Sequence, residues 1–235
     1  VAHTIIKCIE KPNYSTGDVS QRGYVIADGV GSRAFDPKKY FYDAERLEKQ
    51  FWDTLVEDPD GLNYRSVFYC AQSYMDYGMM EKALQWNKLY TKLQNTWIEE
   101  RFEAQMRISQ CLMALEADLN EIISEMDKAI EIFPDRSEPY FHLGKYLNQK
   151  SQHELAYKYL KQATRNSIVN AKNKYVLFVN QYCYGKHIND ELSVACFWVG
   201  KLEEGTNYLK QIINDPEFAS QQERLNTNLQ HFINS

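Results

Sequence analysis

The 235 residues of this chain include 44% apolar residues and carry a formal net charge of -5 at pH 7. A sizeable core can therefore form, either in one larger domain or in two small ones. The acidic balance argues against a general nucleic-acid binder, because such proteins concentrate Lys and Arg on one surface. Because no long apolar run and no signal-peptide order occur, we expect a soluble, cytoplasmic chain without a membrane span. The first residue, Val1, indicates a processed product or a part of a longer protein.

Residues 1–35 differ in composition from the rest of the chain. The runs VAHTIIKCIEK and GYVIAD are short and rich in β-branched residues, with PNYSTGD between them and GVGS after them. They predict two strands with glycine-rich turns. His3 in the first run is either a metal ligand or an ordinary strand histidine. Arg33 is expected to be positioned by a turn, because the segment lacks the GxxxxGK[ST] order of a phosphate loop.

Long amphipathic segments begin at Asp36, which sets the predicted boundary between a strand segment, 1–35, and a helical domain, 36–235. Asp36 suits the N-cap of the first helix, Pro37 suits its first turn, and Pro59 ends it. The apolar periodicity predicts eleven helices in antiparallel order. Their expected ranges are 36–58, 64–77, 79–93, 97–115, 119–132, 138–149, 152–165, 172–183, 190–199, 201–213 and 220–233.

Small residues recur where paired helices would cross. Ala71 and Ala83 lie 12 residues apart, as do Gly144 and Ala156. A third, weaker unit has Gln110 and Ile122 at these positions, while a fourth has Gly200 at its turn and Gly205 where the second small residue is expected. This spacing is typical of tetratricopeptide-type (TPR-like) repeats. The expected fold is mainly α, an α-solenoid of TPR-like antiparallel helix pairs with a concave surface, preceded by a short β-containing segment. The alternative is a helical bundle without repeats.

Few residues suggest chemistry of their own. Asp58-Pro59-Asp60 spells a D-x-D, a pattern that suits Mg²⁺ or Mn²⁺, but it lies in the turn EDPDG, where Asp and Pro are ordinary turn formers. The other histidines lack a carboxylate or cysteine at ligand spacing and are expected to be structural or solvated: His142, His153, His187 and His231. Aromatic residues at helical spacing either stack on sugars in a groove or belong to the core: Phe68, Tyr69, Tyr74, Tyr77, Trp86 and Tyr90.

Four ordered strings between residues 29 and 150 carry a resemblance to a known family. They read GSRAFDPKKYFYDAERLE, EDPDGLNYRSVFYCAQSYMDYGMMEKALQW, TWIEERFEAQMRISQ and FPDRSEPYFHLGKYL. Their matched residues are Gly31, Arg33, Asp36, Pro37, Lys39, Asp58, Pro59, Asp60, Arg65, Phe68, Tyr69, Ala71, Gln72, Ser73, Tyr74, Trp97, Glu99, Glu100, Pro134, Arg136, Glu138 and Pro139. The strings resemble the helical region that follows the catalytic domain in a group of family 2 glycosyltransferases.

The resemblance implies that residues 1 to about 28 end a GT-A type catalytic domain whose nucleotide-binding core lies upstream of Val1. His3 would stand where a histidine completes the metal site, although Thr4 replaces the glutamate that relatives carry next to it. No cofactor is then expected in this chain, while the full enzyme would need Mg²⁺ or Mn²⁺ and a nucleotide sugar. The resemblance also implies residues that bind a substrate or a partner, namely Arg33, Tyr69, Gln72, Tyr74, Trp97 and Arg136.

Two functions are therefore expected. The first is the portion of a nucleotide-sugar-dependent glycosyltransferase that binds a glycan or protein acceptor, or a partner. The alternative is a stand-alone TPR-like scaffold that binds a protein or peptide in its groove without catalysis. In either case, the chain by itself is not expected to catalyse sugar transfer.

Overall fold

The computed structural model describes residues 36–58 and 64–234. The chain divides into two units, Val1–Pro37 and Lys38–Ser235, and all the described helices lie in the second. The two strands predicted within residues 1–35 lie outside the described residues, together with His3 and Arg33. The residues that are described contain no strand, so the β-containing part of the predicted fold has no support.

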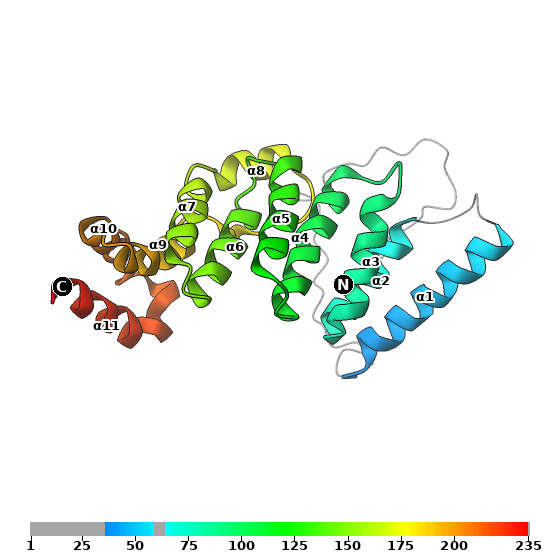
Figure 1. Cartoon of the computed structure of the whole chain (residues 1–235), viewed down its shortest axis with the longest axis horizontal. Helices are drawn as coiled ribbons and strands as arrows, with labels where there is room; N and C mark the ends of the chain where they lie inside the picture. The colour runs from blue at the N-terminus through cyan, green and yellow to red at the C-terminus, as the bar shows by residue number, and fades with distance from the viewer. Residues whose placement is uncertain (1–35, 59–63, 235) are drawn as a thin grey trace, which may run out of the picture. The chain divides into compact units, whose positions relative to one another are not determined.

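The described residues form eleven α-helices and two 3₁₀ segments (Figure 1). In chain order they are α1 (Lys39–Glu57), α2 (Tyr64–Tyr77), α3 (Met80–Lys92), α4 (Ile98–Ala114), α5 (Leu119–Ile132), α6 (Glu138–Gln149), α7 (His153–Ala163), α8 (Ile168–Lys174), η2 (Gln181–Cys183), α9 (Lys186–Trp198), α10 (Leu202–Ile212), η3 (Pro216–Gln221) and α11 (Gln222–Ile233). No described helix is both long enough and apolar enough to span a bilayer.

Eight of these helices form four hairpins, α2 with α3, α4 with α5, α6 with α7, and α9 with α10. The second helix of each hairpin also packs on the first helix of the next: α3 on α4, α5 on α6, and α7 on α9. At the two ends of the stack, α1 packs on α2 and α11 on α10. Each hairpin thus buries its apolar face against a neighbour, which confirms the predicted mainly helical, TPR-like repeat fold.

The first helices of neighbouring hairpins also contact one another, α2 with α4, α4 with α6 and α6 with α9. Among the described elements, successive second helices make no contact of similar extent. In a curved stack, the elements on the inner side lie closer together than those on the outer side. We therefore call the surface formed by α2, α4, α6 and α9 the inner face.

The turn of every hairpin contains one residue with positive φ. These residues are Gly78 (φ 92°), Glu116 (φ 53°), Ser151 (φ 58°) and Gly200 (φ 74°). The N–H that follows each of them donates to a carbonyl five residues earlier: Met79 to Tyr74, Ala117 to Leu112, Gln152 to Leu147, and Lys201 to Cys196. This is the Schellman arrangement that ends a helix through one left-handed residue.

Close approach explains the small residues within the hairpins. A Cβ on Gly144 would lie 2.5 Å from Leu160 Cγ, and one on Gly205 would lie 2.8 Å from Cys196 Cβ. In the α4–α5 hairpin, the prediction that Gln110 lies at the helix crossing is wrong. Ser109 is the fully buried residue there, and its hydroxyl donates to the Ile122 carbonyl over 3.3 Å. The α4–α5 turn is longer than the others, which moves the crossing point away from the 12-residue spacing.

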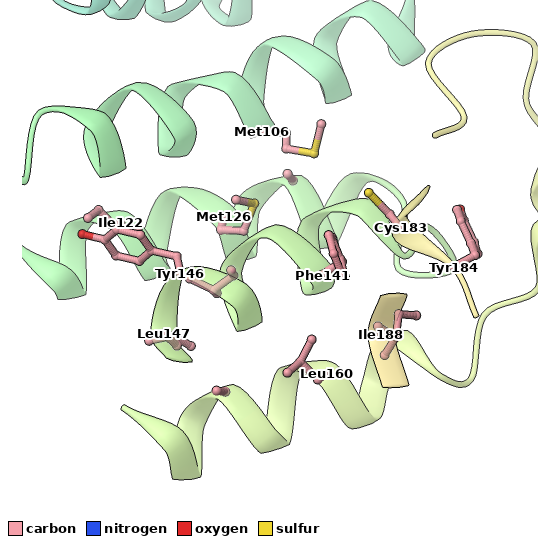
Figure 2. Packing of buried hydrophobic residues seen from close by; sticks show 14 of the residues in the cluster. Met106, Ile122, Met126, Phe141, Tyr146, Leu147, Leu160, Cys183, Tyr184 and Ile188 are labelled. Atoms are coloured by element: carbon pink, nitrogen blue, oxygen red, sulfur yellow. The ribbon is translucent and has the colours of Figure 1, made fainter. Parts of the chain in front are cut away.

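Six successive helices, α4 to α9, contribute to the largest buried cluster (Figure 2). Its members include Met106 from α4, Ile122 and Met126 from α5, Phe141 and Leu147 from α6, Leu160 from α7 and Ile188 from α9. Cys183 and Tyr184, which end the segment between α8 and α9, belong to the same cluster. Tyr175, the first residue of that segment, is also a buried member, so the core holds the segment at both ends.

Three predicted helix positions differ from the structure. The helix expected over 190–199 begins four residues earlier, at Lys186. The helix expected over 172–183 does not form; α8 ends at Lys174, and the chain is extended at Tyr175 (φ -114°, ψ 139°) and Asn180 (φ -96°, ψ 104°). The first helix begins at Lys39, with Lys38 rather than Asp36 at its N-cap position. The extended segment lies against the inner face.

Candidate functional site

The inner face carries polar and aromatic side chains at helical spacing. Arg65, Phe68, Tyr69 and Gln72 lie three or four residues apart on α2, so they share one side of that helix. On α4 the corresponding side carries Glu99, Glu103 and Arg107, each four residues from the next. Arg107 Nη2 lies 3.5 Å from Gln72 Oε1, and this contact joins the two helices across the face.

Residues 175–180, which we call the strap, are held against this face through their main chain. The Glu99 carboxylate accepts from the N–H of Val176 over 3.0 Å and from the N–H of Leu177 over 2.6 Å. Arg136 donates to the carbonyls of Leu177, over 3.3 Å, and Phe178, over 2.7 Å. Charged partners make these hydrogen bonds stronger than bonds between neutral groups. Side chains therefore replace the main-chain partners that a helix or a sheet would supply.

A buried ion pair positions Arg136 under the strap. Arg136 and Glu138 are 0% and 1% exposed, and two hydrogen bonds of 2.9 and 2.8 Å join them side by side. Glu138 also accepts from the N–H of Asn180 over 2.9 Å and from the Tyr184 hydroxyl over 3.0 Å. Burial of a charge is costly where it has no partner. Here Arg136 and Glu138 compensate each other's charge, and both make further hydrogen bonds to the strap.

The ring of Phe178 enters the inner face between α2 and α4. Its centroid lies 5.5 Å from that of Phe68, and the Arg107 guanidinium lies over both rings, 4.8 Å from Phe68 and 5.9 Å from Phe178. Such a cation over an aromatic face is attractive, more so where water is excluded. The Nη1 atom of Arg107 is buried without a hydrogen-bond partner. One donor of this guanidinium is therefore available for a group that the strap does not supply.

A pocket of about 310 Å³ opens where α2 and α4 begin. Its lining includes Tyr64, Arg65, Trp97 and Glu100, and Trp97 is 44% exposed. Glu100 binds Arg65 Nε over 3.0 Å and the Tyr90 hydroxyl over 2.6 Å. Burial, together with the Glu100 carboxylate, raises the pKa of Tyr90, which keeps this phenol protonated. Glu100 is next to Glu99, so the pocket and the strap lie at neighbouring positions of α4.

The structure brings some of the sequence-predicted binding residues together and separates others. Tyr69 and Gln72 lie on the inner face, and Trp97 lines the pocket beside it. Arg136 lies fully buried beneath the strap, where it acts on the chain's own backbone. Tyr74 does not belong to the face; it is fully buried, and its hydroxyl contacts Glu48 of α1 and Lys82 of α3. Its role is to hold three helices together.

The described residues contain no group of three or more His, Cys, Asp or Glu side chains that could hold a metal ion. His3 lies outside the described residues, as do Pro59 and Asp60 of the D-x-D. His142 is partly buried on α6, where Nε2 lies 3.6 Å from Cys183 Sγ and burial lowers the histidine's pKa to about 4. His187 pairs with Glu217 over 2.8 Å and stacks on Tyr182. Both histidines serve packing.

Three residues of the site were not singled out as binding residues by their sequence, namely Glu99, Arg107 and Phe178. The signal for the first two was the four-residue spacing of charges on α4. Phe178 gave no such signal, because its segment has the apolar periodicity of a helix.

A search of the solved structures finds proteins with the same fold. MamA is 17% identical with a TM-score of 0.55, over 84% of this chain and 99% of MamA. BtubC (BKLC) from P. vanneervenii is 10% identical with a TM-score of 0.57, over 85% of this chain and 84% of BtubC. The TPR-like repeats of a Podosopora anserina kinesin light chain are 16% identical with a TM-score of 0.51, over 72% of this chain and 84% of theirs. No family model and no curated protein matches the sequence.

These findings overturn the resemblance to the helical region of family 2 glycosyltransferases. The structures that share the fold are TPR-repeat proteins, and no comparison points to a GT-A enzyme. Packing accounts for several of the matched residues: Tyr74 joins three helices, Arg136 pairs with Glu138, and Ala71 is buried at a helix crossing. A glycan acceptor and a transferase function therefore have no support.

Proposed function

We propose that this chain is a non-catalytic helical-repeat scaffold. Its inner face binds an extended segment of a partner protein. The observation that carries the proposal is the way in which Glu99 of α4 and Arg136, in the turn before α6, hold the strap. Glu99 accepts hydrogen bonds from two main-chain N–H groups, and Arg136 donates hydrogen bonds to two main-chain carbonyls. A surface that pairs with main-chain groups suits an extended peptide of another protein as well as one of its own.

The fold supports the same function. Stacked helix pairs produce a continuous inner surface that is much longer than any one helix, and such surfaces suit extended partners. The TPR-like fold of the similar structures agrees with this but gives no partner for this chain. The aromatic and polar lining next to the strap, with Tyr69, Gln72 and Trp97, provides both apolar contact and hydrogen bonds.

Selection from a random peptide display library on the immobilised chain tests this function. We expect enriched peptides whose binding weakens about ten-fold in Tyr69→Ala, since truncating one central aromatic contact commonly costs more than about 1 kcal/mol. Tyr42→Ala is the matched control, because Tyr42 lies on α1, is 48% exposed and does not belong to the inner face. Failure to enrich any peptide, or enriched peptides that Tyr69→Ala and Tyr42→Ala affect equally, would overturn the proposal.

A further inference from the structure

The strap has the features of a bound peptide more than those of a structural loop. Five of its main-chain groups pair with side chains of other elements, and one aromatic ring enters the surface between α2 and α4. Main-chain pairing combined with a seated side chain is the way in which repeat and groove proteins bind extended partners. The strap therefore occupies this surface in the way that we expect a bound peptide of a partner to occupy it.

Several features make the strap replaceable. Phe178 has φ 60°, a left-handed conformation that is costly for a residue with a bulky side chain. Val176 is 79% exposed, so one side of the strap is open to water. Beneath the ring, the buried Arg107 Nη1 has no hydrogen-bond partner, which leaves a donor unsatisfied. A different occupant with a relaxed backbone and an acceptor for Arg107 would fit the surface better.

We propose that the strap covers a binding site for an extended peptide of a partner protein, and that the partner displaces it. The expected partner segment places an aromatic side chain against Phe68 and Arg107, gives its main-chain N–H groups to Glu99, and offers an oxygen to Arg107 Nη1. This inference rests on the proposed function and names the site and the chemistry of its ligand.

The strap competes with any partner because it is tethered on both sides, to α8 and to the buried Cys183. A short tether gives an effective concentration of the order of millimolar, so a partner has to exceed the strap's own affinity. The strap in place therefore lowers the apparent affinity for a partner. Weakening its hold should raise that affinity without any change in the binding surface.

The test uses fluorescein-labelled KNKYVLFVNQY, which has the sequence of residues 172–182, and a control peptide with alanine in place of its phenylalanine. Phe178→Ala in the full chain removes the ring from the internal strap and leaves Phe68, Glu99 and Arg107 intact. We expect fluorescence anisotropy to show binding at least about ten-fold tighter to Phe178→Ala than to the wild-type chain. The control peptide should bind both chains weakly, and Glu99→Gln added to Phe178→Ala should remove most of the gain.

Equal binding of the peptide to wild-type chain and to folded Phe178→Ala would overturn the inference, as would equal binding of the two peptides. If Phe178→Ala does not fold, hydrogen exchange of the wild-type chain tests whether the peptide displaces the strap. Excess peptide should then speed exchange of the Val176 and Leu177 amides, and an unchanged rate would be contrary to displacement. A dimer formed by strap exchange would also contradict it, and sedimentation would detect that dimer. Library-selected peptides that bind the wild-type chain and Phe178→Ala equally well would refute displacement while leaving the proposed function intact.

Discussion

At the scale of single residues, the most consequential feature is the buried Arg136–Glu138 pair. It joins three parts of the chain, because Arg136 holds the strap carbonyls while Glu138 holds the Asn180 N–H and the Tyr184 hydroxyl. A buried ion pair adds little stability compared with apolar residues of the same shape, but removing one partner leaves an uncompensated charge. The pair therefore fixes the position of the strap more than it adds to the free energy of unfolding.

Arg136→Met should lower the free energy of unfolding by about 3–5 kcal/mol, because Glu138 and two strap carbonyls lose their partner. Urea denaturation of the variant and the wild-type chain measures the change. Arg224→Met is the matched control, since Arg224 makes a similar two-bond pair with Asp190 but its side chain is 42% exposed. The control should cost about 1 kcal/mol or less. Equal losses in the two variants would contradict the role assigned to Arg136.

His142 gives a pH dependence of stability. Burial is the main cause that lowers its pKa to about 4; Glu138 raises the pKa and Lys145 lowers it. The unfolded chain takes up the proton near the ordinary histidine pKa of 6.5, so this contribution to stability is complete above that pH and is lost as pH falls toward 4. Urea denaturation should therefore show that the free energy of unfolding falls between pH 7 and pH 4. The fall should be smaller in His142→Asn than in the wild-type chain, by an amount on the order of 2 kcal/mol. Identical pH profiles in the two chains would contradict this origin.

At the scale of elements, the sequence predicts most helices to within a residue or two. The expected ranges 64–77, 119–132 and 138–149 coincide with α2, α5 and α6. Helix periodicity and flanking turn residues are local signals, so local reasoning finds them. The left-handed residues Glu116 and Ser151 were not predicted, because neither turn contains a glycine. These turns are defined by their Schellman hydrogen bonds and not by residue type.

The segment 172–183 was predicted wrongly for a physical reason. Its apolar periodicity fits a helix, but Val176 and Val179 are β-branched, and Glu99, Arg136 and Glu138 pair with the backbone groups that helical bonds would use. Those partners lie about 40 to 80 residues away in the sequence, so no local pattern reveals them. The strap is an element that tertiary contacts define.

Ser151→Gly should stabilise the chain by about 0.5–1 kcal/mol, because Ser151 has φ 58° and glycine adopts that conformation without strain. Gly200→Ser is the reciprocal control, with φ 74° and open space around its Cβ position, and should destabilise by a similar amount. Thermal unfolding followed by circular dichroism measures both variants. A shift in the same direction for the two would show that backbone strain does not decide stability at these turns.

At the scale of the whole helical unit, stability is a sum over neighbours, because the main packing contacts of each described hairpin are with the elements next to it. Local sequence signals gave this repeat order correctly. They did not give the inner-face site. Of its residues, helical spacing marked Phe68 and Tyr69 for a groove or the core, and the resemblance that the comparisons overturn named Tyr69, Gln72, Trp97 and Arg136. Glu99, Arg107 and Phe178 come together from α4 and from a segment after α8, and such a juxtaposition follows from the stacked fold alone.

Phe232→Ala tests this neighbour-by-neighbour view. Phe232 of α11 fills the space beside Gly205 of α10, and its truncation should cost about 3–4 kcal/mol. Hydrogen exchange should then accelerate in α9, α10 and α11, while α2 and α3 keep their wild-type rates. Uniform acceleration through all the described helices would contradict a stack with local coupling, since it would mean that the unit unfolds as one body.

The most direct test of the central claim is hydrogen exchange of the wild-type chain with and without a peptide selected on it from a random library. The claim is that partners bind on the inner face formed by α2, α4, α6 and α9. Binding should therefore slow exchange at Tyr69 and Gln72 of α2 and at Glu103 and Arg107 of α4, while the second helices α3, α5 and α7 remain unchanged. Protection confined to the second helices, or to residues outside the Lys38–Ser235 unit, would contradict the claim.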